Sequence, residues 1–339
     1  MDVDYLIIGQ GLAGSALAIA LSDLGATVLV VDSGDEDSAS KVAAGLITTV
    51  AGKGMNLSWR QSEYLPEALE YYSRFEALSG EKLFYPVETL RLFDDEKQKL
   101  KFQSKVESLD GWVKEPANED FIGWKADHGG FIMERGGRLD TRLYLQVIRE
   151  FLGERYYEGE FNEADLEITT GGVRWKNVTA KKLILCQGAR GFTEGGLFSD
   201  LPHRSAKGEI LTVSIPNTNQ DKIINRNGWM IPIGGDLWRC GATYEWRELS
   251  GDKTDVGKRA VEQKIKDLTG APFKLVEHSV GIRPILRKSQ PFIGYHSDHP
   301  EVGFFNGLGS KGVTTAPSVA AHFAQHLVNG VKIDSELVL

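Results

Sequence analysis

The chain has 339 residues, more than a single hydrophobic core usually accommodates, so we expect two cooperating domains. Hydrophobic residues make up 41% and charged residues 25%, an ordinary globular composition that excludes a largely disordered chain. The formal net charge of −8 excludes a general basic field for capturing nucleic acid, although a local basic patch is compatible with it.

The cysteines and the N-terminus bear on the location of the protein. Cys186 and Cys240 lie in apolar strand-like runs, which favours reduced, packed cysteines over a disulfide. Asp2 and Asp4 stand where a signal peptide would carry positive charge, and Asp23 and several glycines interrupt the apolar stretch that follows. No stretch of transmembrane length is free of charges or glycine clusters. We therefore expect a soluble, cytoplasmic protein without a membrane partner.

The first 32 residues are typical of a βαβ unit. Residues 4–8 form an apolar run, residues 15–24 show helical spacing, and residues 27–31 form a second, β-branched run. The sequence GQGLAG at residues 9–14 lies between the first run and the helix, and Asp32 ends the second run. This context favours a dinucleotide site over a glycine-rich turn without a ligand.

The glycines of this loop each have a physical role in such a site. Gly9 permits the tight turn, Gly11 lets the backbone approach a pyrophosphate, and Gly14 allows the helix to pack closely on the strand. The helix N-terminus favours the phosphate charge, and Asp32 would accept hydrogen bonds from the adenosine ribose. The loop by itself does not distinguish FAD from NAD, because both contain adenosine diphosphate.

Further helices and strands are expected along the rest of the chain. Asp140 is a candidate N-cap, and the final helix should carry Pro317 in its first turn. Residues 205–246 have the pattern of an antiparallel meander, with the turn at residues 234–236 (GGD). The other predicted helices cover residues 56–79, 94–109, 254–269 and 314–329.

Three segments resemble the D-amino acid oxidase and glycine oxidase superfamily of flavoproteins, and the resemblance covers nearly the whole length. Residues 43–47 (AAGLI) are similar to the family's small-residue segment beside the flavin. Residues 137–140 (GRLD) resemble the entry into its central helix, and residues 185–189 (LCQGA) resemble a turn near the cofactor, with Cys186 in place of alanine. The resemblance implies that the dinucleotide is FAD.

The most specific part of the resemblance is the pair GIRP at residues 281–284 and PFIG at residues 291–294, similar to the family's Gly-x-Arg-Pro and Pro-x-Ile-Gly. By that resemblance Arg283 would bind the substrate carboxylate. A guanidinium is always charged, and its planar fork can hold a carboxylate through two hydrogen bonds. The alternative is an arginine in a structural ion pair.

The C-terminal loop at residues 307–312 (GLGSKG) leads into the last helix. Free backbone N–H groups, the helix N-terminus and Lys311 would stabilise the negative charge of a reduced flavin. The alternative is a plain loop with a solvated lysine. This segment also resembles the Gly-Ser-Arg-Gly ending of the FAD domain in the bifunctional enzyme that modifies tRNA wobble uridines, with Lys311 in place of the arginine.

The resemblance implies an α/β protein with a Rossmann-like FAD-binding domain and an antiparallel-sheet substrate domain. The FAD-binding domain would be discontinuous and span residues 1–82, 130–200 and 275–339. The substrate domain would span residues 83–129 and 201–274.

The implied reaction is oxidation of the C–N bond of a small amino acid or N-substituted glycine, by hydride transfer to flavin N5. Trp229 and Tyr244 are candidate walls of the substrate pocket, although aromatic residues in strands are more often core residues. Two alternatives remain: oxidation of a carboxymethylaminomethyl-type nucleoside in tRNA, and a flavin-binding redox module without turnover. The electron acceptor, oxygen or another molecule, and the oligomeric state stay open.

No metal is expected, because His322 and His326 lack a third ligand with motif spacing. The FAD is expected to be non-covalent, since neither cysteine has a context that suggests a covalent link. The residues predicted to contact FAD are Gly9, Gly11, Leu12, Ala13, Gly14, Asp32, Ser33, Ala44, Gly45, Leu46, Gly188, Gly309, Ser310, Lys311, Gly312 and Val313.

Overall fold

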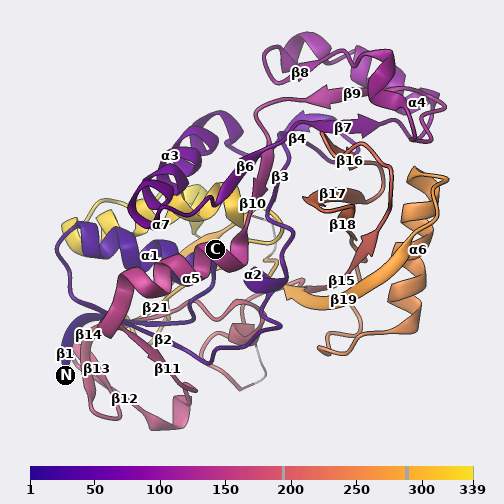
Figure 1. The fold of residues 1–339 in the computed structure, drawn as a ribbon. Helices are drawn as coiled ribbons and strands as arrows, with labels where there is room; N and C mark the ends of the chain where they lie inside the picture. Colours follow the sequence, from indigo (N-terminus) through magenta and orange to yellow (C-terminus); the bar gives the residue numbers. More distant parts are fainter. Residues whose placement is uncertain (193–194, 287–289, 339) are drawn as a thin grey trace.

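Two eight-stranded sheets form the framework of the part of the chain that the computed structural model describes, residues 1–192, 195–286 and 290–338 (Figure 1). The strands of the first sheet are β1 (Asp2–Ile8), β2 (Val28–Asp32), β11 (Tyr156–Glu158), β12 (Leu166–Thr169), β13 (Gly172–Trp175), β14 (Val178–Leu185), β20 (Phe292–Tyr295) and β21 (Val302–Asn306). Their order is β11-β2-β1-β14-β13-β12, with β21 paired to β14 and β20 paired to β21. The predicted α/β class is confirmed.

The parallel part of the first sheet decides where its loops meet. Strand β1 pairs in parallel with β2 and with β14, and β14 pairs in parallel with β21. The carboxyl ends of these four strands therefore share one edge, which is the usual place for a ligand in an open α/β sheet.

Helices α1 (Leu12–Asp23), α3 (Gln61–Ser79), α5 (Thr141–Leu152) and α7 (Gly312–Asn329) cover one face of this sheet (Figure 1). The alternation of β1 divides its side chains, so that Tyr5 and Ile7 pack against the helices while Leu6 and Ile8 face the opposite core. Helix α5 begins as predicted, because the side chain of Asp140 accepts a hydrogen bond from the Leu143 N–H at 3.1 Å.

The last helix differs from the expectation at its start. Helix α7 begins at Gly312, so Pro317 lies inside the helix and not in its first turn. Proline has no N–H to donate to the carbonyl four residues earlier, which belongs to Val313. The buried Tyr72 hydroxyl donates to this carbonyl at 2.7 Å and satisfies it. The proline is tolerated because α3 supplies the missing donor.

The second sheet is antiparallel except for one pair. Its strands are β7 (Thr89–Leu92), β8 (Val113–Lys114), β9 (Gly130–Met133), β15 (Ala206–Ser214), β16 (Ile223–Asn225), β17 (Trp229–Gly234), β18 (Leu237–Gly241) and β19 (Lys274–Arg283). They follow the order β19-β15-β18-β17-β16-β7-β9-β8, in which only β16 and β7 run parallel among the described strands. The predicted turn between β17 and β18 is confirmed, since Gly234, Gly235 and Asp236 all have positive φ angles.

One face of the second sheet packs against helix α6 (Asp255–Leu268), which Thr254 caps by accepting from the Gly257 N–H at 2.9 Å. Met230, Trp238 and Cys240 belong to the core on this side. The residues that alternate with them point to the other face, toward the first sheet.

Shorter elements complete the fold, some between the two sheets and some within the loops of one sheet. They are α2 (Ala39–Val42), α4 (Glu96–Gln103), the small strands β3 (Leu46–Ile47), β4 (Val50–Ala51), β5 (Asn56–Leu57), β6 (Phe84–Pro86) and β10 (Gly137–Leu139), and the 3₁₀ helices Val106–Leu109, Asn118–Phe121, Gly153–Arg155, Glu163–Asp165, Gly188–Phe192 and Ser335–Leu337. The helix predicted at residues 56–79 starts at Gln61, because β5 pairs with β4. The helix predicted at residues 94–109 is divided into α4 and a 3₁₀ turn.

Two strands that the prediction assigns wholly or mostly to the FAD-binding domain pair with strands of the second sheet. Strand β9 begins at the boundary at residue 130, and β19 spans the boundary at residue 275, yet both pair within the second sheet. The domain boundaries stay a prediction. None of the described helices is long and apolar enough to span a membrane.

We expect Tyr72→Phe to lower the free energy of unfolding by about 1–3 kcal/mol, because it leaves the buried Val313 carbonyl without a donor. Chemical denaturation checks this. The control is Tyr157→Phe, which removes a hydroxyl from an exposed tyrosine. Equal losses in the two variants would contradict the role of Tyr72.

Candidate functional site

The glycine loop between β1 and α1 has the close contacts that its sequence predicts. Gly9 has a φ of +101°, and a Cβ added there would lie 2.5 Å from the Cys186 carbonyl oxygen. A Cβ added at Gly14 would lie 1.8 Å from the Gly9 carbonyl oxygen. Both positions therefore exclude a side chain for reasons internal to the fold.

Gly11 differs from these two glycines. It precedes α1 with a φ of −78°, which any residue can adopt. The nearest atom to an added Cβ would be the Ser40 Oγ, at 2.9 Å, which accepts a hydrogen bond from the Leu12 N–H at 3.1 Å. The fold therefore tolerates a side chain at Gly11 better than at Gly9 or Gly14, because the end of a serine side chain and not a backbone carbonyl lies against it.

Asp32 ties this loop to the end of β2. Its carboxylate accepts hydrogen bonds from the Gln10 N–H at 2.7 Å and from the Gly34 N–H at 2.8 Å. Leu12 and Ala13 are buried in the first turn of α1, and Ser33 accepts a hydrogen bond from Arg190 at 3.3 Å. A glycine cradle at a helix N-terminus beside a carboxylate fits the adenosine diphosphate half of FAD.

The C-terminal loop reaches the same edge of the first sheet. The Gly309 N–H donates to the Pro284 carbonyl at 2.9 Å, which ties the loop to the end of β19. A Cβ added at Gly312 would lie 3.0 Å from the Leu12 side chain, so α7 begins against α1. Gly188 joins this group, because its carbonyl accepts from Asn306 at 2.8 Å. The structure thus brings the predicted segments together.

Residues 42–52, which we call the bridging segment, run between the two sheets and include the predicted Ala44, Gly45 and Leu46. Gly45 has a φ of +69°, and a Cβ added there would lie 1.9 Å from the Leu139 carbonyl oxygen. Leu46 lies in β3 and pairs with β10. The segment is therefore fixed against the strand that leads into α5.

Cations from separate parts of the chain bind the carbonyl groups of the bridging segment. Arg239 in β18 donates to the carbonyls of Val42 and Ala43, at 2.7 and 3.0 Å. Lys311, at the start of α7, donates to the hydroxyl and the carbonyl of Thr48, at 2.7 and 3.2 Å.

Arg91 in β7 is the third of these cations, and it donates to Val50 and Gly52 at 3.1 and 2.9 Å. Burial lowers the pKa of Arg91 and of Arg239. Burial, and to a lesser degree the charge of Arg91, lowers the pKa of Lys311 to about 8. Among the described residues, no carboxylate lies within 4.0 Å of the nitrogens of these three side chains. Main-chain carbonyls and the Thr48 hydroxyl are the direct partners of the three cations, while the charge of Asp94 acts on Arg91 and that of Glu277 on Arg239 from a greater distance.

Arg283 is the last residue of β19 and also has no carboxylate within 4.0 Å in the described part of the chain. Its guanidinium lies over Gly208, where an added Cβ would come within 2.3–2.6 Å of it. It donates to the Thr243 carbonyl at 3.3 Å and stacks on the Tyr244 ring at 4.6 Å. Burial lowers its pKa. The ion-pair alternative therefore finds no partner among these residues.

Trp229 lies on the same face of the second sheet. It pairs with Gly241, which in turn pairs with Ile210, and a Cβ added at Gly241 would lie 2.8 Å from the indole. Gly208 is two residues from Ile210 and so shares its face. Glycines at 208 and 241 thus provide the room in which Arg283 and Trp229 lie flat on the sheet.

Tyr244 is 45% exposed and Trp246 is 59% exposed, so neither is a core residue. Their ring centroids are 5.1 Å apart. The Tyr244 ring stacks on the guanidinium of Arg283. Tyr244 and Trp246 therefore form an aromatic pair at the surface beside Arg283.

The sequence analysis missed Arg91 and Arg239. Both are single cations in apolar strands, in the runs TLRLF and LWRCG, at positions that alternate with core residues. That alternation was a usable signal, because a charged residue in such a strand must point away from the core.

The two C-terminal histidines have structural partners. His322 accepts from the Asp334 N–H at 3.0 Å, and the His326 Nδ1 lies 2.7 Å from the Val331 carbonyl oxygen. Within the described ranges, no group of three or more His, Cys, Asp or Glu side chains could hold a metal ion.

We expect Gly11→Val to fold but to lose most of its FAD, because within the protein its Cβ would meet only the Ser40 side chain, whereas it would block the approach of a pyrophosphate to the backbone at the start of α1. Gly14→Ala should instead lower the melting temperature, since its Cβ would meet the Gly9 backbone. Flavin absorbance per folded protein, together with circular dichroism, separates the two effects. Full flavin content in Gly11→Val would place the pyrophosphate elsewhere.

The pKa of Lys311 predicts a pH-dependent stability. Its pKa is about 8 in the folded chain and about 10.5 when unfolded, so between these values the unfolded chain binds more protons. The free energy of unfolding of wild type, relative to Lys311→Met, should therefore rise as the pH increases from 8 to 10. Denaturation of both flavin-free proteins checks this, and a difference that stays constant over this range would contradict it.

Comparisons with known proteins agree with this geometry. A family model described as FAD dependent oxidoreductase matches residues 4–326. A glycine oxidase from Geobacillus kaustophilus is similar over 100% of this chain and 98% of its own, with 16% identity and a TM-score of 0.83. The iminodiacetate oxidase from Chelativorans sp. BNC1 is similar over 98% of both chains, with 21% identity and a TM-score of 0.80.

A third solved structure, an L-proline dehydrogenase from P. horikoshii, is similar over 99% of this chain and 95% of its own, with 14% identity and a TM-score of 0.79. At these identities the solved structures show a shared fold. The family model covers well over half of the chain. The chain belongs to the FAD-dependent oxidoreductase family, and FAD is its cofactor.

Proposed function

We propose that this protein oxidises the C–N bond of a small amino acid or N-substituted glycine, with FAD bound non-covalently. The observation that supports this most is Arg283, a desolvated guanidinium without a carboxylate partner among the described residues. A buried cation is costly unless it is paired. A substrate carboxylate would provide that pair.

The neighbours in structure support the same class of substrate. Their names refer to iminodiacetate, glycine and L-proline, and in each of these molecules the amine nitrogen and a carboxylate are bonded to the same carbon. A carboxylate held by Arg283 would present the adjacent C–N bond at a constant position.

Each side chain of the site has a role in this reaction. Arg283 would hold the carboxylate through two hydrogen bonds, and Tyr244 would keep the guanidinium in place. Trp229 would form a flat wall on the sheet face and exclude water. The charges of Arg283 and Lys311 would disfavour a protonated amine and so keep it in the neutral, oxidisable form.

Bound FAD supplies the acceptor for two electrons. The amine becomes an imine by losing these electrons and two protons, and water hydrolyses the imine to a carbonyl compound and an amine. The residues of the chain bind and orient the substrate, and none of them has to act as a base if the amine is neutral.

The alternative substrate, a carboxymethylaminomethyl nucleoside in tRNA, stays a prediction. The resemblance of residues 307–312 to the wobble-uridine enzyme favours it, whereas the net charge of −8 disfavours binding a polyanion. Flavin bleaching by tRNA that carries this nucleoside, but not by small amino acids, would favour the alternative.

We expect Arg283→Ala to retain FAD but to bind its best amino acid at least 30-fold more weakly. Truncating one partner of a buried charge pair costs about 2–5 kcal/mol. Arg283→Lys keeps the charge and loses the fork, so it should also bind more weakly. Anaerobic flavin bleaching against substrate concentration gives these affinities.

The amide of the same amino acid is the matched control, because it lacks the carboxylate. Its affinity should differ little between wild type and Arg283→Ala. Wild-type affinity for the acid in Arg283→Ala, or a best substrate without any carboxylate, would contradict the proposal.

A further inference from the structure

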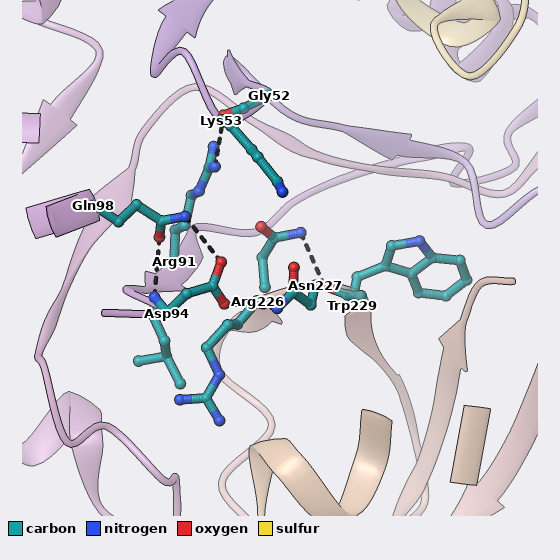
Figure 2. Close-up of a pocket in the computed structure, with 11 residues that line it drawn as sticks. Gly52, Lys53, Arg91, Asp94, Gln98, Arg226, Asn227 and Trp229 are labelled. Carbon is teal, nitrogen blue, oxygen red and sulfur yellow. Dashed lines mark hydrogen bonds between the residues drawn. The ribbon is translucent and has the colours of Figure 1, made fainter. Parts of the chain in front are cut away.

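A basic cavity of about 250 Å³ lies beside the candidate substrate site (Figure 2). Its lining includes the cations Lys53, Arg91 and Arg226, the carboxylate of Asp94, and Trp229. Three positive groups thus face one negative group, in a chain whose net charge is −8. The cavity is an exception to the acidic character of the protein.

The polar groups of the lining differ in their availability. Asp94 accepts from the side-chain amides of Asn227 and Gln98, at 2.8 and 2.9 Å. Arg226 donates to the main-chain carbonyls of Lys125 and Asp267, and Figure 2 shows its guanidinium directed away from Lys53. These two charged groups already have partners.

Lys53 and Arg91 are the cations available to a ligand. Lys53 is exposed, and no carboxylate of the described residues lies within 4.0 Å of its amine. Figure 2 shows its side chain extending from the turn at Gly52 toward the side of the cavity where Asn227 and Trp229 lie. Arg91 donates to the carbonyls of Val50 and Gly52, and the charge of Asp94 acts on it, but no carboxylate of the described residues lies within 4.0 Å of its nitrogens. Figure 2 shows that its guanidinium, unlike that of Arg226, lies on the Lys53 side of the cavity.

Two contacts connect this cavity to the substrate site. Trp229 lines the cavity, while its indole lies over Gly241 on the face that carries Arg283. Arg91 lies close enough to Lys311 to lower its pKa, and both side chains bind the bridging segment. The cavity is therefore a neighbour of the site: Trp229 belongs to both, whereas Arg283 does not line the cavity.

We propose that this cavity binds a second acidic group of the substrate, so that the substrate is an amino acid or N-substituted glycine with a carboxylate at each end. This inference rests on the proposed function. One carboxylate pairs with Arg283, the C–N bond lies against Trp229, and the second carboxylate pairs with Lys53 and Arg91. The two anions compensate charges that have no carboxylate partner among the described residues.

A small anion suits this cavity better than a nucleic acid does. Three cations line it, and Arg226 already has partners. Binding of nucleic acid relies on an extended set of about six to ten phosphate contacts. A volume of about 250 Å³ takes a short carboxyalkyl chain.

The binding test uses ligands that cannot be oxidised. They are thioether analogues in which sulfur replaces the amine, HOOC-CH₂-S-(CH₂)n-COOH with one to four methylenes, each paired with its terminal amide. Isothermal titration calorimetry of the FAD-loaded protein should give a dissociation constant about tenfold lower for the best diacid than for its amide. Equal dissociation constants along the whole series would overturn the proposal.

Lys53→Gln is the informative variant, because Lys53 is exposed and its loss should leave the fold intact. It should weaken binding of the best diacid about fivefold, and of its amide less than twofold. Lys97→Gln is the matched control, since Lys97 is an exposed lysine of the neighbouring α4 that does not line the cavity. Equal effects of Lys53→Gln on both ligands, or equal effects of the two variants, would overturn the subsite.

The amine series, N-(carboxyalkyl)glycines and their terminal amides, separates the two proposals. Flavin bleaching by acids and amides with equal KM would overturn the second subsite and leave the proposed function intact. If small amino acids bleach the flavin and no member of this series does, the second subsite is overturned; if neither the series nor any small amino acid bleaches the flavin, the proposed function is contradicted. A Lys53-dependent preference for thioether diacids would then still support an acidic ligand in the cavity.

Discussion

The bridging segment is the constraint on which the site depends. This segment runs between the two sheets, and hydrogen bonds to its backbone hold it there. Its carbonyl groups accept from Arg239, Lys311 and Arg91. Each cation comes from a different part of the chain, two from the second sheet and one from the last helix. Main-chain carbonyls and the Thr48 hydroxyl accept from these cations, and none of the described carboxylates forms an ion pair with them. Positive charge therefore accumulates where the two sheets meet.

The first sheet brings together the loops predicted to hold the cofactor. Because β1, β2, β14 and β21 run parallel, the loops that follow them meet at one edge. The glycine loop and Asp32 form one part of that edge, and residues 307–312 form another. The Gly309 N–H bond to the Pro284 carbonyl then fixes this edge to the end of β19. The same bond places Arg283 beside the cofactor loops.

The second sheet carries the side chains proposed to bind the substrate. One face is filled by α6 and an apolar core, while the other carries Arg283 and Trp229 on a floor that includes Gly208 and Gly241. Larger residues at these glycines would displace the guanidinium or the indole. The arrangement of the site thus depends on the two glycines as well as on Arg283 and Trp229. Because glycine has no side chain, the guanidinium and the indole can lie flat on the antiparallel sheet.

Local patterns in the sequence were sufficient for the βαβ unit, the N-cap at Asp140, the β17–β18 turn and the role of Gly9 and Gly14, because each depends on neighbours within a few residues. Arg283 was singled out by the family resemblance of residues 281–284 and not by a local pattern, and its role stays a prediction. Local patterns missed the interior position of Pro317, because the donor to Val313 comes from Tyr72 in a distant helix. They missed Arg91, Arg239 and the basic cavity for the same reason. The partners of a cation in a strand are set by which sheets face each other, and only the tertiary structure decides that.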